Sequence, residues 1–368
     1  MTTTRRNSAG RLNAVCPYFT MFPLEFPLGV LRDAEPGQLV VDPFCGRGTT
    51  NYAARTLGLP SIGVDSSPVA VALSEAKLAN ASPQRIVTAA RRILCDMPEP
   101  SEVPEGEFWR WAFYPDVLKV LCRLREGLLN NCRSDTRKAL RAILLGALHG
   151  PRRKSRPSHF SNQSQRTYAP KPRYAVNYWR KHNLIPEPVD VLSIIHERAV
   201  RYYSNEKVAS GRIITGDSRR SIFTRAARGE KASWIVTSPP YYGLRTYLPD
   251  QWLRNWFLGG PSEVEYSTEG QILHSSPEAF ALDLRQVWRN VGRISAPGAR
   301  LVVRFGGIND RKADPLHIIR TSLEGSGFEL QKITPAGSAS NGQRQALHFS
   351  RTSSAAREEH DILAVRVG

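Results

Sequence analysis

The sequence predicts an α/β protein with a doubly wound, mostly parallel sheet and a helical, basic insertion. Strand and helix patterns alternate from residue 38 to 79, and strands return at 212 after a long helical interruption. Parallel strands need a crossover connection, which this alternation supplies. The chain has 368 residues and a formal net charge of +18. It is long enough to bury a large core.

The first two predicted strands are short and apolar, and an acidic residue stands at the end of each. Residues 38–41 lead into Asp42, and residues 61–65 end at Asp65. Helices are expected at 50–57 and 68–79, the second opening with a proline, which suits the first turn of a helix. This is the local pattern of strands in a parallel sheet.

The rest of the chain completes the sheet around an insertion. Apolar residues at helical spacing predict helices at 107–130, 134–149, 188–204 and 281–293, and further strands are expected at 212–217, 234–237, 300–305, 328–333 and 361–367, the last antiparallel. We therefore expect one catalytic domain from residues 1–98 and 207–368, with a loose basic tail at 1–14. Residues 99–206 form the expected insertion, which we interpret as the target-recognition region.

Charge and cysteine content limit the classes of function. A net charge of +18 favours a polyanionic partner, above all nucleic acid. No apolar run approaches membrane-spanning length and no apolar signal core is present, so no membrane partner is expected. Five cysteines without a C-x-x-C pair indicate neither a zinc ribbon nor a disulfide framework, and they favour a cytoplasmic protein without a metal.

The segment DPFCGRGTT (42–50) predicts a ligand-binding loop. Gly46 and Gly48 permit a tight turn and a close backbone approach, and the following helix offers free N–H groups. The loop lacks the lysine of a phosphate-binding P-loop, and Asp42 would repel a pyrophosphate. An acid here suits a cationic ligand or a ribose, and Asp65 is placed to hold ribose hydroxyls.

The segment TSPPYYG (237–243) has two prolines and two tyrosines directly after a predicted strand, a composition that a simple turn does not need. The prolines fix the backbone, so the Pro239 carbonyl becomes a preoriented acceptor, and the Ser238 hydroxyl offers a second one. Tyr241 offers a ring on which an extruded base could stack, so the ring and not its hydroxyl is expected to act. The alternative is a structural Pro-Pro turn with core tyrosines.

These two segments resemble those of a known family. DPFCGRGTT with GVDSSPVAVALSEAKL is similar to the S-adenosylmethionine-binding half of DNA amino-methyltransferases, and TSPPY is similar to their catalytic motif. The resemblance implies a seven-stranded Rossmann-like methyltransferase sheet, S-adenosyl-L-methionine as cofactor and DNA as partner. It also implies methyl transfer to the exocyclic amino group of a flipped base, with a cognate restriction endonuclease as a further partner.

The resemblance assigns residues to the site. Asp42, Phe44, Gly46 and Gly48 would line the methionine side, while Asp65 would take the ribose and Asp217 would lie near the adenine. The implied cofactor-binding set is Thr20, Phe22, Asp42, Pro43, Phe44, Gly46, Gly48, Thr49, Thr50, Asp65, Ser66, Asp217 and Ser238, and the implied catalytic set is Ser238, Pro239, Pro240 and Tyr241. Residues 18–23 resemble the family's extra cofactor segment, although a hydrophobic staple onto the core fits them nearly as well.

The sequence leaves open which base is methylated and whether the substrate is DNA. Serine at 238 favours cytosine N4 over adenine N6 within this family, and no Pro-Cys pair supplies the thiolate that carbon-5 methylation needs. RNA methylation by the same motif and a non-catalytic DNA-binding protein are further hypotheses. The first would appear as activity on transcribed RNA, and the second as DNA binding without turnover.

Residues 151–183 hold nine Lys or Arg, no acid and several interleaved aromatics, with little periodicity. This composition predicts a nucleic-acid surface, and a solvated basic loop is the alternative. The expected nucleic-acid-binding set is Arg152, Arg153, Lys154, Arg156, Arg166, Lys171, Arg173 and Tyr241. Base edges could be read by Ser161, Asn162, Gln163 and Gln165.

Overall fold

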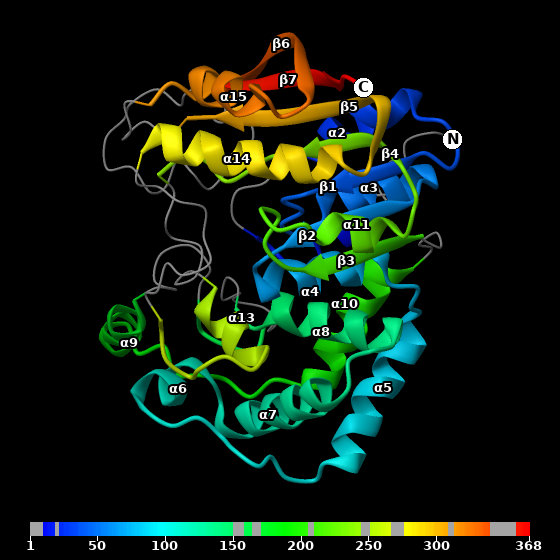
Figure 1. Cartoon of the computed structure of the whole chain (residues 1–368). Coiled ribbons are helices and arrows are strands. Elements are labelled where there is room, and N and C mark those ends of the chain that lie inside the picture. Colours follow the sequence, from blue (N-terminus) through cyan, green and yellow to red (C-terminus); the bar gives the residue numbers. More distant parts are fainter. Residues whose placement is uncertain are drawn as a thin grey trace, which may run out of the picture. The chain divides into compact units, whose positions relative to one another are not determined.

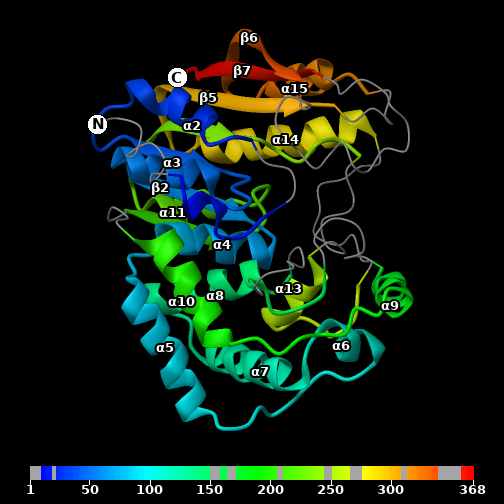
Figure 2. The same cartoon turned by 180° about the vertical axis from the view of Figure 1, so that it is seen from behind.

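The computed structural model describes residues 10–18, 22–149, 158–163, 171–204, 210–243, 251–265, 276–307, 313–338 and 358–368. The chain divides into two compact units, each assembled from several segments (Figures 1 and 2). The sheet unit comprises residues 18–78, 207–245 and 268–368. The helical unit comprises residues 1–17, 79–206 and 246–267.

The sheet unit contains a seven-stranded sheet in the order β3-β2-β1-β4-β5-β7-β6. Its strands are β1 (Leu39–Asp42), β2 (Ser61–Asp65), β3 (Gly211–Thr215), β4 (Ala232–Thr237), β5 (Ser295–Gly306), β6 (Phe328–Ser338) and β7 (Glu358–Arg366). Strands β1 to β5 pair in parallel, and β7 is antiparallel to both β5 and β6. The predicted Rossmann-like methyltransferase sheet is confirmed, including its antiparallel last strand.

Strand β1 lies where the chain reverses its direction across the sheet. On one side Val40 is level with Ser61 of β2, and on the other side it is level with Trp234 of β4. In doubly wound sheets the loops after two such strands diverge and leave a ligand site at their carboxyl ends. Asp42 ends β1 and Thr237 ends β4, so the two segments of interest leave the sheet side by side.

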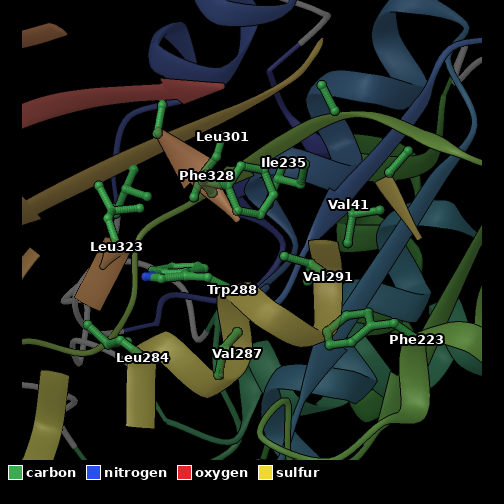
Figure 3. Packing of buried hydrophobic residues seen from close by; sticks show 14 of the residues in the cluster. Val41, Phe223, Ile235, Leu284, Val287, Trp288, Val291, Leu301, Leu323 and Phe328 are labelled. Atoms are coloured by element: carbon green, nitrogen blue, oxygen red, sulfur yellow. The ribbon is translucent and has the colours of Figure 1, made fainter. Parts of the chain in front are cut away.

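Alternate residues of the central strands face different helical layers. Val40 and Trp234 belong to a cluster with α2 (Glu25–Val30) and α3 (Thr49–Leu57). Val41 and Ile235 face the opposite layer, where they pack with α14 (Pro277–Gly292) (Figure 3). The period of two along a strand therefore anchors both layers through the same two strands.

The remaining helices of the sheet unit are short. They are α4 (Pro68–Leu78), α11 (Ile222–Ala227), α15 (Pro315–Leu323) and the 3-10 helix η2 (Leu31–Asp33). Helices α11 and α15 join α14 on its face of the sheet, where Phe223 and Ile319 are fully or almost fully buried. At the centre of that layer the buried Trp288 donates its ring N–H to Ser322 Oγ at 3.0 Å. This bond links α14 to α15.

The helical unit is built from η1 (Leu12–Ala14), α5 (Pro83–Asp96), α6 (Glu107–Ala112), α7 (Pro115–Asn130), α8 (Asp135–Ala147), α9 (Pro172–Lys181), α10 (Val191–Tyr203) and α13 (Trp252–Phe257). The single helix expected at 107–130 is wrong, because it is broken before Pro115. Tyr114, which precedes that proline, has extended backbone angles of φ −66° and ψ 138°, as steric contact with the proline ring favours.

The expected insertion, 99–206, lies within the helical unit, which also takes in residues 79–98. Helix α5 in that added stretch was not expected, although Ser82 caps it by accepting from the Arg85 N–H and Pro83 opens it. Helix α9 was not expected either. Within the described ranges, no helix combines the length and the apolar character needed to cross a membrane.

Candidate functional site

The ends of β1 and β4 are joined by side-chain hydrogen bonds. The Thr237 hydroxyl donates to Asp42 Oδ1 at 2.6 Å, and both residues are fully buried. The Thr50 hydroxyl, in the first turn of α3, donates to the Val236 carbonyl at 3.2 Å. The glycine loop and the segment beginning at Ser238 are thus held together, although 180-odd residues separate them in the sequence.

The Asp42 carboxyl group is fully buried and has no contact with solvent. Loss of solvent raises its pKa to about 6, while the hydroxyls of Thr237 and Thr50 and the Phe44 amide oppose the rise. Oδ1 also accepts from the Phe44 N–H at 3.1 Å. Oδ2 is buried and accepts no hydrogen bond among the described residues, because the nearby Thr50 hydroxyl donates to the Val236 carbonyl instead. A buried, unpartnered carboxylate oxygen is costly, and a cationic donor would relieve that cost.

The two glycines of the loop meet different constraints. Gly48 has φ +74°, and a Cβ placed there would lie 2.9 Å from the Cα of Ser74 on α4. Gly46 has φ +50°, and a Cβ there would meet no atom within 4 Å. Gly48 therefore permits α3 to approach α4, whereas Gly46 leaves open space beside the backbone. Ser74 also donates its hydroxyl to the Gly46 carbonyl at 2.8 Å.

Asp65 is bound to the glycine loop through its carboxylate. Oδ2 accepts from the Gly46 N–H at 2.9 Å, and Oδ1 accepts from the Ser67 N–H at 2.9 Å. Loss of solvent raises the pKa of Asp65, and these backbone bonds counteract the rise. The side chain is only partly buried. Each oxygen retains a lone pair, so the carboxylate can still accept hydrogen bonds from a ligand.

The loop after β3 is also fixed to the glycine loop. The Ser218 hydroxyl donates to the Pro43 carbonyl at 2.5 Å. The carbonyl of Ser218 accepts from the Asn290 side chain of α14 at 3.1 Å. Beside it, the Phe44 ring lies edge-on to Trp288, with ring centroids 6.3 Å apart. Ser218 was not predicted to take part in the site, because nothing in the local sequence indicates a contact across 175 residues.

Asp217 already has a charged partner. The Arg219 guanidinium donates to both carboxylate oxygens, at 2.6–3.0 Å, and to Asp283 Oδ2 at 2.9 Å. Hydrogen bonding to Arg219 outweighs partial burial, and the pKa of Asp217 is lowered. An adenine amino group would have to share this carboxylate with Arg219. The assignment of Asp217 to the adenine stays a prediction.

The segment Ser238–Tyr241 follows β4, and its tyrosine is held by contacts with β5 and β7. The Tyr241 hydroxyl donates to Glu359 Oε1 at 2.6 Å, and Glu359, on β7, is 5% exposed. The Tyr241 ring lies edge-on to Phe305, with centroids 5.6 Å apart. The tyrosine thus partly belongs to the core, as the structural alternative expects. Base stacking on this ring stays a prediction, and the sequence analysis missed Glu359.

The other expected cofactor residues differ in their surroundings. Thr49 and Thr50 are buried, and Thr50 is occupied by the β4 contact described above. Ser66 is exposed. Phe22 packs edge-on against Phe26 at 5.3 Å between ring centroids, the arrangement expected of a hydrophobic staple. Thr20 lies outside the described residues.

The expected nucleic-acid surface is only partly described. Arg152, Arg153, Lys154, Arg156 and Arg166 lie outside the described residues, as does Gln165. Lys171 and Arg173 are exposed, Lys171 just before α9 and Arg173 in its first turn.

Several polar and aromatic residues of the basic stretch 151–183 support the fold. Phe160 is 2% exposed and Trp179 is 3% exposed, so both rings are in the core. The Ser161 hydroxyl donates to the Leu148 carbonyl at 2.6 Å. The Asn162 side chain donates to the Trp111 carbonyl at 3.0 Å and to the Leu184 carbonyl at 2.8 Å. The donors of Ser161 and Asn162 are therefore used within the fold, and base reading by these two residues stays a prediction.

Comparison with known proteins shows a sequence similarity in the N-terminal segment. Residues 2–76 match the sequence profile of the DNA methylase family that comprises N6 and N4 methyltransferases. The resemblance to DNA amino-methyltransferases is confirmed over this segment. The chain is also similar to the type II methyltransferase M.MjaII of Methanocaldococcus jannaschii, with 38% identity over 66 residues. That match spans 18% of this chain and 12% of the relative.

Solved structures with a similar arrangement are distant in sequence. The rRNA methyltransferase aviRa from Streptomyces viridochromogenes is 12% identical, with a TM-score of 0.35 over 95% of this chain and 87% of that one. TrmN from Thermus thermophilus is 12% identical, with a TM-score of 0.38 over 98% of this chain and 53% of that one. The description of the fold therefore rests on the strand order itself.

We expect Gly48→Ala to destabilise the chain more than the matched control Gly46→Ala. Both alanines would adopt a left-handed backbone, which costs roughly 1–2 kcal/mol. Only Gly48→Ala also overlaps Ser74, and overpacking adds about 1–3 kcal/mol. Urea unfolding of both variants measures the difference. Equal losses of unfolding free energy would show that the contact between α3 and α4 does not require Gly48.

Proposed function

We propose that this chain is an S-adenosylmethionine-dependent methyltransferase that modifies the exocyclic amino group of a flipped base in DNA. Cytosine N4 is the favoured target, and adenine N6 is the alternative. A role as the cytoplasmic modification enzyme of a restriction-modification or defence system, beside a cognate endonuclease, belongs to the same proposal. It rests on the family resemblance and on cysteines that form no disulfide framework.

The observation that carries the proposal is the hydrogen bond between Thr237 and Asp42 at 2.6 Å. It joins a loop suited to a cationic cofactor to a segment suited to an amino group. Each segment alone has a structural explanation. Their meeting at the carboxyl ends of two adjacent parallel strands, β1 and β4, is the arrangement that a two-substrate transfer requires.

The residues around the glycine loop fit the cofactor. Asp42 has a buried oxygen without a partner, which suits the amino-acid end of S-adenosylmethionine. Gly46 leaves open space where a side chain would otherwise stand. The partly buried Asp65 carboxylate retains lone pairs for ribose hydroxyls. When bound, the cofactor supplies an activated methyl group on a sulfonium.

The chain's own contribution to the reaction is orientation. A base amino group is a weak nucleophile because its lone pair is delocalised into the ring. The carbonyl of Pro239 and the hydroxyl of Ser238 are acceptors for its hydrogens, so that the nitrogen can become tetrahedral as the bond forms. No hydrogen bond within the described residues occupies the Ser238 hydroxyl. The reaction is a direct displacement and needs no covalent enzyme intermediate.

The identity of the methylated base is the first test. Purified protein is incubated with DNA and labelled S-adenosylmethionine, and the nucleosides are separated by mass spectrometry. We expect label in N4-methylcytosine, because Ser238 stands before Pro-Pro. Label in N6-methyladenine alone would overturn the choice of base. Label in 5-methylcytosine, or only in an RNA control, would overturn the proposed chemistry or substrate.

We expect Asp65→Ala to weaken S-adenosylmethionine binding. A charge-assisted hydrogen bond is worth roughly 1.5–3 kcal/mol, so affinity should fall about 10- to 150-fold. Calorimetric titration measures the change, and Asp33→Ala, an exposed acid outside the loop, is the control. Unchanged affinity in a folded Asp65→Ala protein would remove this residue from the cofactor site.

Cofactor affinity should depend on pH through Asp42. The pKa of this carboxyl is raised to about 6, so near pH 5 it is largely protonated. A cationic ligand favours the carboxylate, lowers its pKa and releases a proton on binding. Affinity should therefore fall as the pH drops below about 6. Asp65 contributes in the same direction, because its pKa is also raised.

Calorimetry from pH 5 to 8, in buffers of different ionisation enthalpy, measures both the affinity and the released proton. Asp42→Asn cannot titrate, so it should lose the part of the pH dependence that Asp42 contributes. The same pH profile in wild type and in a folded Asp42→Asn protein would contradict contact between Asp42 and a cationic group of the cofactor.

We expect Tyr241→Ala to reduce methyl transfer far more than cofactor binding, since base stacking is worth about 1–3 kcal/mol. Tyr241→Phe keeps the ring but leaves the buried Glu359 without this donor, so it should lower stability. Single-turnover kinetics and urea unfolding separate the two effects. If Tyr241→Phe abolishes transfer while stability is unchanged, the phenol itself acts in the reaction.

A further inference from the structure

Helix α9 is anchored to the helical unit by one face. Ala175, Val176 and Trp179 are buried, and the Trp179 ring lies 5.7 Å from the Phe108 ring of α6, centroid to centroid. Figures 1 and 2 both show α9 beside α6 at the margin of this unit. The three buried positions recur at helical spacing, so the opposite side of α9 faces solvent.

The solvent-facing side combines cations, an amide and aromatic rings. Arg173, Tyr174, Asn177, Tyr178 and Lys181 are all exposed, with Tyr174 at 54% and Tyr178 at 39%. Their separations of one, three and four residues place them on one side of the helix. The sequence has no Asp or Glu from residue 171 to 186. Two large exposed rings are unusual on a surface that only contacts water, so they indicate a binding surface. The surrounding cations favour a polyanionic partner.

The orientation of this face is fixed by its neighbours. Arg180, at the end of α9, pairs with Glu107 of α6, and its guanidinium lies over the Trp111 ring at 5.8 Å from the centroid. The chain beyond α9 is held by Asn162, which donates to the Leu184 carbonyl at 2.8 Å. The face is therefore pre-organised, and binding would require little further ordering.

We infer that α9 is the recognition helix of this protein and enters the major groove of its duplex DNA substrate. The inference rests on the proposed function for the identity of the substrate. The major groove admits an α-helix, an Asn side chain can pair with adenine, and Arg or Lys can pair with guanine. Asn177 reads a base pair, while Arg173 and Lys181 contact guanine or the phosphates on either side.

Groove entry is favoured over stacking of unpaired bases on the same helix. Stacking needs an open ring face, and the Tyr178 ring is already against the His182 ring, with centroids 4.4 Å apart at 45°. The stacking surfaces of single-strand binders present aromatic rings along a groove, whereas α9 is a convex helix. The two modes differ in whether duplex or single strand binds more tightly.

Salt dependence of binding tests the surface. The double variant Arg173→Ala/Lys181→Ala is compared with Arg91→Ala/Lys119→Ala, which removes two exposed cations from other helices of the same unit. Fluorescence anisotropy on duplex and single strands of one sequence gives affinity against salt concentration. Each lost phosphate contact should lower the log–log slope by about 0.9, for the α9 variant and not for the control.

An unchanged slope for the α9 variant, or tighter binding of the single strand than of the duplex by wild type, would overturn the inference. Absence of any DNA binding would overturn it as well. DNA binding without methyl transfer would instead refute the proposed function, while the slopes of the two double variants would still decide the role of α9.

Sequence preference tests the base contact. Wild type and Asn177→Ala are given a random-sequence duplex library with S-adenosylmethionine, and methylated positions are identified by sequencing. Asn177→Ala should keep the target base but lose discrimination at one neighbouring base pair, by about 5- to 150-fold. Asn183→Ala, an exposed amide beyond the helix, should retain the wild-type preference. An unchanged preference in Asn177→Ala would show that α9 does not read bases.

Discussion

A buried hydrogen bond from the Thr237 hydroxyl to the Asp42 carboxylate links the last residues of β1 and β4. Parallel pairing brings these two strands into register, but their loops could still diverge beyond the sheet. The bond fixes the point where they leave it. Asp42 also receives the Phe44 N–H, so the same carboxylate shapes the start of the glycine loop. The glycine loop and the segment Ser238–Tyr241 therefore share one buried acid.

Burial gives that acid a second property. Loss of solvent raises its pKa to about 6, and one oxygen lacks a partner among the described residues. A fold that only needed to join two strands could use a neutral side chain at lower cost. Under the proposed function, the charge of a cationic ligand would compensate for the lost solvation of this acid. In the proposed function Asp42 therefore both links β1 to β4 and faces the cofactor.

The sequence predicted the sheet better than it predicted the helical unit. The alternation of strands and helices predicted parallel pairing, and the family resemblance implied the seven-stranded sheet. The hydrogen bond between Asp42 and Thr237 was not predicted, because it joins residues 195 positions apart. Glu359 could not be anticipated, since its contact with Tyr241 spans 118 residues. The basic stretch misled because composition does not distinguish buried from exposed rings. Phe160, which precedes α9, is a core residue. On α9 itself Trp179 is buried while Tyr174 and Tyr178 face solvent, and the helical phase separates these three rings.

In the proposed function the glycine loop and the segment Ser238–Tyr241 form one site, and a crystal structure with S-adenosylhomocysteine tests this most directly. We expect density for the ligand over Gly46, with its ribose hydroxyls on Asp65, its amino-acid end toward Asp42 and its sulfur facing Ser238 and Pro239. Ligand bound away from the glycine loop, or with its sulfur turned from Ser238 and Pro239, would contradict the claim.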